Sequence, residues 1–267
     1  MAMDTSAPTL ESVSSADGTQ IAVWRAGQGP PLVLVHGTAA DHARWAPVLP
    51  ALAERFTVLA VDRRGRGESG DARDYAIGRE FEDIAAVADH AGGGACVLGH
   101  SFGALCALEG ALLSRPLRAL VLYEPPGKGS VPSGDALARL ETLLAEGDRD
   151  RFMGVFMAEV AGVRPEQIEA MRSQPAWAAR LAAAHTIPRE LRAVGEHRFD
   201  PAAFRDLAVP TLLLQGDATR ESFKEAVSRV DAALPDSRIV AMSGQGHTAM
   251  DTATELFVSE VVSFLEG

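Results

Sequence analysis

The chain has 267 residues, of which 47% are hydrophobic and 23% are charged, so it is long enough to bury the core of one large α/β domain. Its formal net charge of −11 argues against nucleic acid or an anionic membrane surface as a partner, because both select basic surfaces. The first ten residues lack the pattern of a secretory signal, and no apolar run approaches the about 18 residues that span a membrane, so we expect a cytoplasmic protein.

Short apolar runs and helical stretches alternate along most of the chain. We expect an early hairpin from strands at 10–14 and 20–24, turned at Asp17-Gly18. Further strands are expected at 32–35, 56–61, 95–98, 119–123, 211–214 and 238–241, and helices at 42–54, 77–91, 101–114, 221–234 and 252–265. This alternation predicts a mostly parallel eight-stranded sheet with helices on both faces.

Residues 127–207 interrupt the alternation, because they contain no clear strand. Helices are expected there at 135–146, 149–160, 165–173 and 176–185. An insertion of about 80 residues is too long for a simple connection. We therefore predict a core of 1–126 and 208–267, with 127–207 as a helical cap over the carboxyl end of the sheet, where such sheets bind ligands.

The motif G-x-S-x-G occupies residues 99–103, between a predicted strand and a predicted helix. In that setting Ser101 sits on a sharp turn with its hydroxyl exposed, and the two glycines leave room for a backbone that a β-carbon would obstruct. The helix that follows directs free N–H groups at an oxyanion. Alone, the motif also fits a chance match. Its context predicts that Ser101 is a nucleophile.

A serine hydroxyl needs a base at neutral pH, and the base needs an acid that orients it. Among seven histidines, His247 is the best candidate, because it follows the last predicted strand on a glycine-bearing loop. The alternative is a surface histidine or one that caps a helix. Chain order and location favour the base.

Four segments, in this order, resemble the α/β-hydrolase fold over nearly the whole chain. They are a strand followed by His36-Gly37, a D-x-R-G-x-G-x-S loop at 62–69, the motif around Ser101, and the late His247. The resemblance implies an oxyanion hole made by the backbone N–H groups of Thr38 and Phe102, which would stabilise the developing negative charge.

The acid departs from the family pattern, because the expected position after the seventh strand holds Thr219, which cannot serve. Asp217 lies close to that position and is one candidate. Glu124, directly after the sixth predicted strand, is the other, because some members of the superfamily place the acid there and two prolines would stiffen its turn. We favour Glu124 over Asp217, and the alternative for Glu124 is a carboxylate that anchors the cap.

The cap should supply the substrate pocket. Its apolar residues occur at helical spacing, so their first role is packing, although together they would form an apolar cover. His36 flanks the site, and the orientation of loops by hydrogen bonds is its more ordinary role. The candidate pocket residues are His36, Phe152, Phe156, Met157, Trp177 and His185.

No cofactor or metal is expected. Residues 65–70 formally satisfy G-x-G-x-x-G, but a polar loop continues where a dinucleotide site needs a helix. No cluster of cysteines and histidines has the spacing of metal ligands.

Together these features predict a serine hydrolase that cleaves a carboxylic ester, lactone or thioester of a mainly apolar small molecule through an acyl-enzyme on Ser101. The serine argues against haloalkane dehalogenases and epoxide hydrolases, which need a carboxylate nucleophile. Carbon–carbon bond hydrolysis, acyl transfer and cofactor-free perhydrolysis on the same fold are alternatives, as is a non-catalytic ligand-binding protein. The expected partner is a small-molecule substrate, and nothing in the sequence points to an oligomeric state.

Overall fold

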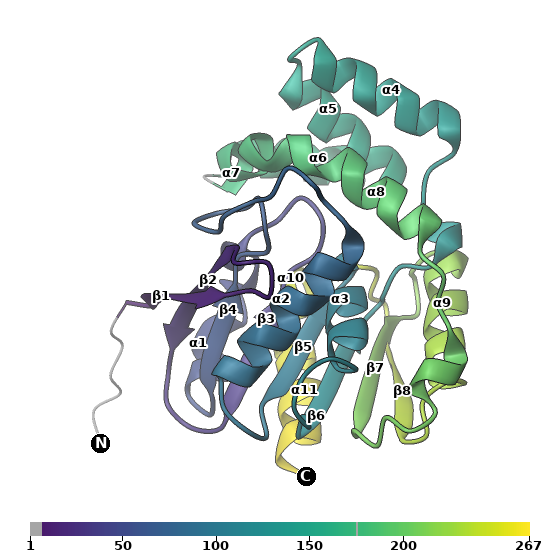
Figure 1. Cartoon of the computed structure of the whole chain (residues 1–267). Coiled ribbons are helices and arrows are strands. Elements are labelled where there is room, and N and C mark those ends of the chain that lie inside the picture. The colour runs from purple at the N-terminus through teal and green to yellow at the C-terminus, as the bar shows by residue number, and fades with distance from the viewer. Residues whose placement is uncertain (1–6, 175) are drawn as a thin grey trace.

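The computed structural model describes residues 7–174 and 176–267, and the core they form is one eight-stranded sheet in the order β1-β2-β4-β3-β5-β6-β7-β8 (Figure 1). β1 (Thr9–Ser14) and β2 (Gln20–Ala26) form an antiparallel hairpin, and β2 also pairs antiparallel with β4. The remaining pairs are parallel, which confirms the predicted mostly parallel sheet. The other strands are β3 (Pro31–Val35), β4 (Thr57–Val61), β5 (Cys96–His100), β6 (Ala119–Tyr123), β7 (Thr211–Gly216) and β8 (Ser237–Met242).

Both faces of the sheet are covered, which explains why the central strands are apolar at every position. In β3, Val33 and Val35 face one buried cluster, whereas Leu32 and Leu34 face the other. The first cluster lies under α2 (Ile77–His90), α3 (Phe102–Gly110) and α9 (Glu221–Asp231), and the second under α1 (Leu49–Ala53) and α11 (Thr254–Glu266) (Figure 1).

One predicted helix of the core is broken in the structure, and another is preceded by a short helix that the sequence did not predict. The stretch predicted at 42–54 forms a 3-10 helix, η1 (His42–Trp45), and then α1, because Pro47 has no N–H with which to continue the first helix. The stretch predicted at 252–265 forms α11, which begins just after Ala253. The φ of −149° and ψ of 54° at Ala253 are not helical, so this residue separates α11 from the short helix α10 (Ala249–Thr252).

Helices α4 to α8 form a layer over the carboxyl ends of the strands (Figure 1). They pack around their own apolar cluster, which includes Phe152, Trp177 and Ile187. The α-helices are α4 (Gly134–Ala145), α5 (Arg149–Val155), α6 (Pro165–Arg172), α7 (Ala176–Ala182) and α8 (Ile187–Glu196). The shorter helices between or beside them are η2 (Lys128–Ser130), the π-helix η3 (Phe156–Val160), η4 (Ala183–Thr186) and η5 (Pro201–Phe204).

The sequence did not predict α8, and the boundaries of the cap at 127 and 207 stay a prediction. Within residues 7–174 and 176–267, no helix combines the length and the apolar character that a membrane crossing requires.

Candidate active site

Ser101 occupies a sharp turn between β5 and α3, with φ 55° and ψ −125°, and its N–H donates to the carbonyl of Tyr123 at 2.9 Å. The glycines on either side are needed for this turn. A β-carbon on Gly99 would lie 2.5 Å from the carbonyl oxygen of Gly103, and one on Gly103 would lie 2.3 Å from that of Val35. Both distances are far below van der Waals contact, so the turn holds only with glycine at these positions.

Two backbone N–H groups are free beside the serine. Phe102 is the first residue of α3, where a helix leaves its N–H groups unbonded, and Thr38 follows β3 on the adjacent loop. Neither N–H donates to a backbone carbonyl among the described residues, and both residues line the same cavity as Ser101. Their arrangement suits the stabilisation of an oxyanion.

Backbone strain gathers at this edge of the sheet. In the part of the chain that the structure describes, the non-glycine residues with positive φ are Ala39 (57°), Ser101 (55°) and Glu124 (48°). Such conformations persist where the surrounding structure enforces them, and they concentrate at functional sites. Each of these residues is, or directly follows, a candidate site residue.

Glu124 follows β6 and is fully buried, and three donors hold its carboxylate. Oε1 accepts from the N–H of Gly216 at 2.8 Å. Oε2 accepts from the hydroxyl of Thr219 at 2.9 Å and lies 2.5 Å from Nδ1 of His247. Thr219 thus stands where the family pattern places an acid and donates instead to the acid of the neighbouring strand.

Asp217, the alternative acid, points elsewhere. It is exposed, and its own N–H donates to the carbonyl of Met242 at 3.2 Å. Its carboxylate forms no hydrogen bond or ion pair with another described residue. The structure therefore brings Glu124, and not Asp217, to His247.

His247 is held from several directions. The ring of Phe223 stacks on its ring with centroids 4.2 Å apart, and Nε2 of His100 lies 2.8 Å from its carbonyl oxygen. The hydroxyl of Tyr123 donates to the carbonyl of Gly246, the residue just before His247. Burial, and after it the charge of His247, lowers the pKa of His100 well below its ordinary value, so His100 is a neutral donor here.

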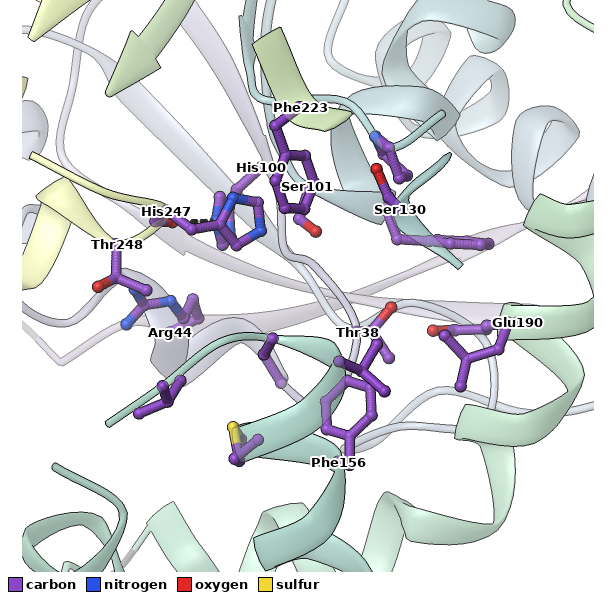
Figure 2. A pocket seen from close by; sticks show the side chains of 18 of the residues that line it. Thr38, Arg44, His100, Ser101, Ser130, Phe156, Glu190, Phe223, His247 and Thr248 are labelled. Carbon is purple, nitrogen blue, oxygen red and sulfur yellow. Dashed lines mark hydrogen bonds between the residues drawn. The ribbon is translucent and has the colours of Figure 1, made fainter. Parts of the chain in front are cut away.

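Ser101 and His247 both line the cavity under the cap (Figure 2). In Figure 2, His247 and Thr248 lie on one side of Ser101, and Ser130 and Glu190 lie on the other. The hydroxyl of Ser101 forms no hydrogen bond to another residue that the structure describes. Such contacts often tighten only when substrate is bound.

Of the residues predicted to line the pocket, Phe156 and Met157 do so. Phe152 and Trp177 instead pack inside the apolar cluster of the cap, where Nε1 of Trp177 donates to Asp150 at 2.9 Å. His185 is exposed, and its Nδ1 lies 3.0 Å from the carbonyl oxygen of Ala182, one helical turn earlier. Helical spacing did not separate the face of the cap that packs inward from the face that meets the cavity.

His36 is also outside the cavity wall, and this corrects its prediction as a pocket residue. It is fully buried, with Nδ1 2.8 Å from the carbonyl oxygen of Gly37 and Nε2 accepting from the N–H of Arg63 at 3.1 Å. Burial, and after it the charge of Arg63, lowers its pKa well below the ordinary value. His36 is therefore a neutral side chain that joins two loops.

A buried charge network beside the cavity escaped the sequence analysis. Nη2 of Arg63 donates to Oε1 of Glu190 at 2.9 Å, and Nη2 of Arg66 lies 2.5 Å from the same oxygen. Nη1 of Arg63 also donates to Glu80 at 3.0 Å. Burial alone would raise the pKa of Glu190, but the two arginines outweigh it and hold that pKa below its ordinary value.

The network joins the cap to the core, because Glu190 lies on α8 and both arginines lie on the loop after β4. The sequence analysis identified this loop as the D-x-R-G-x-G-x-S motif at 62–69, but it did not predict that Glu190 on α8 pairs with the arginines of the loop. Among the described residues, no group of three or more His, Cys, Asp or Glu side chains is arranged to hold a metal ion.

Comparison with known proteins agrees with this fold. Residues 32–260 match the model of a family described as the alpha/beta hydrolase family. The crystal structure of an alpha/beta hydrolase from Sphaerobacter thermophilus is similar with a TM-score of 0.82 and 39% identity, over 95% of this chain and 99% of that one. The crystal structure of an esterase from a Rhodococcus species is similar with a TM-score of 0.77 and 27% identity, over 97% and 98%. A 2-(acetamidomethylene)succinate hydrolase from Mesorhizobium japonicum is 25% identical over 271 residues, which cover 90% of each chain.

Proposed function

The chain belongs to the alpha/beta hydrolase family, and from this premise we propose that it is a serine hydrolase of carboxylic esters, lactones or thioesters. Esterases and other hydrolases are among its relatives. The observation that carries the proposal is the 2.5 Å contact between Nδ1 of His247 and Glu124, in a site where Ser101 lies on a strained turn beside two free N–H groups.

In the proposed reaction, Oγ of Ser101 attacks the substrate carbonyl while Nε2 of His247 takes its proton. Glu124 stabilises the resulting imidazolium through Nδ1, and the N–H groups of Thr38 and Phe102 hold the oxyanion. When the tetrahedral intermediate collapses, His247 gives the proton to the departing alcohol or thiol, which leaves an acyl group on Ser101. His247 then activates a water that releases the acid and restores the serine.

The apolar wall of the cavity supports a mainly apolar substrate. Phe156 and Met157 contribute to it from the cap, together with Leu191 on α8. Because the cap supplies these side chains, we also propose that residues 127–207 act as the lid that selects the substrate.

A fluorophosphonate probe tests the nucleophile. The probe phosphonylates an activated serine, so we expect the wild-type protein to be labelled and the S101A variant to remain unlabelled. Ser130 also lines the cavity, so S130A is the matched control and should be labelled like the wild type. Equal labelling of S101A, or no labelling of the wild type, contradicts the proposal.

A panel of p-nitrophenyl esters of increasing chain length, with lactones and thioesters, then tests the reaction class. We expect turnover of at least one member, lost in S101A. Turnover of carbon–carbon substrates such as diketones, with none of any ester, lactone or thioester, would replace ester hydrolysis by carbon–carbon bond hydrolysis.

A further inference from the structure

Arg180 is a cation in the cavity wall that pairs with no carboxylate in the described parts of the chain. It lies on α7, lines the cavity of Ser101, and is partly buried. Its Nη1 donates to the carbonyl of Ala39 at 2.9 Å, and this is its one hydrogen bond to a described residue. A guanidinium remains protonated even in such surroundings, so the charge is present in the folded protein.

The other charged side chains of the cavity wall balance one another. Asp251 accepts from Nη1 and from Nη2 of Arg44, each at 2.7 Å. Glu190 belongs to the network in which two arginines face two glutamates. Arg180 is therefore the charged side chain of this wall that forms no ion pair with a described residue, although Asp41 and Asp251 line a neighbouring hollow that Arg180 also borders. The chain as a whole has a formal net charge of −11.

The free edge of Arg180 has the right shape for a carboxylate. Because Nη1 is engaged with Ala39, the Nε and Nη2 groups remain, and they form one side of the planar guanidinium. Two parallel N–H donors on that side match the two oxygen atoms of a carboxylate. In an apolar, partly desolvated cavity such a pair is stronger than it would be at the protein surface.

We propose that Arg180 binds a carboxylate of the substrate, so that the preferred substrate is an ester, lactone or thioester that carries a carboxylate beside its scissile group. This inference rests on the proposed function of Ser101. Arg180 lines a second hollow together with Arg44 and Asp251, and in Figure 2 Arg44 lies on the same side of Ser101 as His247 and Thr248. Because the leaving group must face His247 to receive its proton, the carboxylate is expected on the leaving-group side.

Matched substrates test the carboxylate. For the leaving-group side we compare 3-acetoxybenzoate with the neutral 3-acetoxybenzamide, which has nearly the same shape. For the acyl side we compare the phenyl monoester of adipic acid with its primary amide. We expect the wild type to favour the anionic member of the first pair by about 10-fold or more in kcat/KM, as a charged hydrogen-bonded contact permits.

The R180M variant removes the charge and keeps much of the length of the side chain. It also removes the contact with Ala39, which changes both members of a pair alike, so the readout is the ratio of the two kcat/KM values. We expect that ratio to fall by about 10- to 100-fold in R180M. The R192M variant is the control, because Arg192 pairs with Glu141 on the exposed side of the cap, and its ratio should equal that of the wild type.

Each result bears on the inference. If R180M loses the preference for the anionic member of the first pair, Arg180 binds a carboxylate on the leaving-group side, as proposed. If R180M loses the preference only for the second pair, Arg180 binds a carboxylate on the acyl side. The inference is overturned if the wild type hydrolyses the anionic and neutral members of both pairs equally well, or if R180M keeps the wild-type ratio. In either case, hydrolysis of the neutral ester leaves the proposed function intact. Absence of hydrolysis of every ester overturns the proposed function instead.

A binding measurement is independent of turnover. Glutarate should bind to the S101A protein in calorimetry, and its affinity should fall by about 10-fold or more in the S101A/R180M double variant. Equal affinity of the two proteins for glutarate contradicts a carboxylate site at Arg180.

Discussion

The two sides of the cavity differ in how their charged groups are partnered. On the core side, three donors engage the carboxylate of Glu124, and they come from the backbone of Gly216 and the side chains of Thr219 and His247. On the cap side, Arg180 keeps one edge of its guanidinium unbonded to any described residue, in a cavity wall that is mainly apolar. A buried group that is held by several partners positions its neighbour, whereas a group with free donors can still bind a ligand. The core side therefore suits the chemical step, and the cap side suits the choice of substrate.

The E124Q variant tests the core side and should have the largest effect. The N–H of Gly216 requires an oxygen at the Oε1 position, so the amide nitrogen of the glutamine must face His247. Nδ1 of His247 would then have to accept, which moves its proton to Nε2 and leaves no base for Ser101. We expect kcat to fall by about 10⁴-fold, as when a triad acid is replaced by its amide.

The D217N variant is the control for E124Q, because Asp217 is exposed. Its kcat should remain within about threefold of the wild type, since surface substitutions usually change little. A large loss in D217N together with a small loss in E124Q, in folded proteins, would assign the acid to Asp217.

The R63M variant tests how the two sides are joined. Removing this guanidinium leaves the carboxylates of Glu80 and Glu190 buried with fewer partners. We expect the free energy of unfolding to fall by about 3–5 kcal/mol, as when one partner of a buried ion pair is lost. Urea denaturation measures this change.

The R189M variant is the control for R63M, because Arg189 also joins α8 to the loop after β4. It pairs with Asp71 at 2.8 Å, but both side chains are partly exposed. Its loss should cost about 1 kcal/mol or less, because solvent screens such a pair. Equal destabilisation by R63M and R189M would show that the buried ion pairs of Arg63 stabilise the contact between α8 and the loop after β4 no more than the partly exposed pair of Arg189 does.

The T219V variant has the smallest expected effect and tests whether the hydroxyl of Thr219 helps to orient Glu124. Valine keeps the shape of threonine but removes the hydroxyl that donates to Oε2 at 2.9 Å. Glu124 keeps its contact with His247, so we expect kcat to fall by about 10-fold, the worth of one hydrogen bond to a charged group. The T142V variant, on an exposed face of α4, should leave kcat unchanged. A kcat in T219V equal to that of the wild type would show that this hydroxyl does not help to orient the acid.

The sequence predicted the sheet well because its strands are short, apolar and separated by turn residues. Every expected strand is present, and β6 has the predicted bounds of 119 and 123. The predicted bounds of a helix were wrong where one residue interrupts the periodic pattern, as Pro47 does between η1 and α1. The helix α8 was missed, although it carries Glu190.

Contacts between distant segments could not be predicted from the sequence. The order of residues along the chain allowed both Glu124 and Asp217 as the acid. Only in the folded sheet, where β6 pairs with β7, do Thr219 and His247 both contact the carboxylate of Glu124. In the same way, helical spacing marked Phe152 and Phe156 alike. Their burial in the cap cluster or exposure to the cavity depends on how the helices of the cap dock.

Rapid-mixing mass spectrometry of the intact protein can detect the acyl-enzyme that we propose on Ser101. After mixing with a p-nitrophenyl ester, the protein should gain the mass of one acyl group, carried by the peptide that contains Ser101. The gain should appear with a burst of p-nitrophenolate, decay as free acid is released, and be absent in S101A. Turnover at the wild-type rate in S101A, or an acyl group carried by another residue, would show that Ser101 is not the nucleophile.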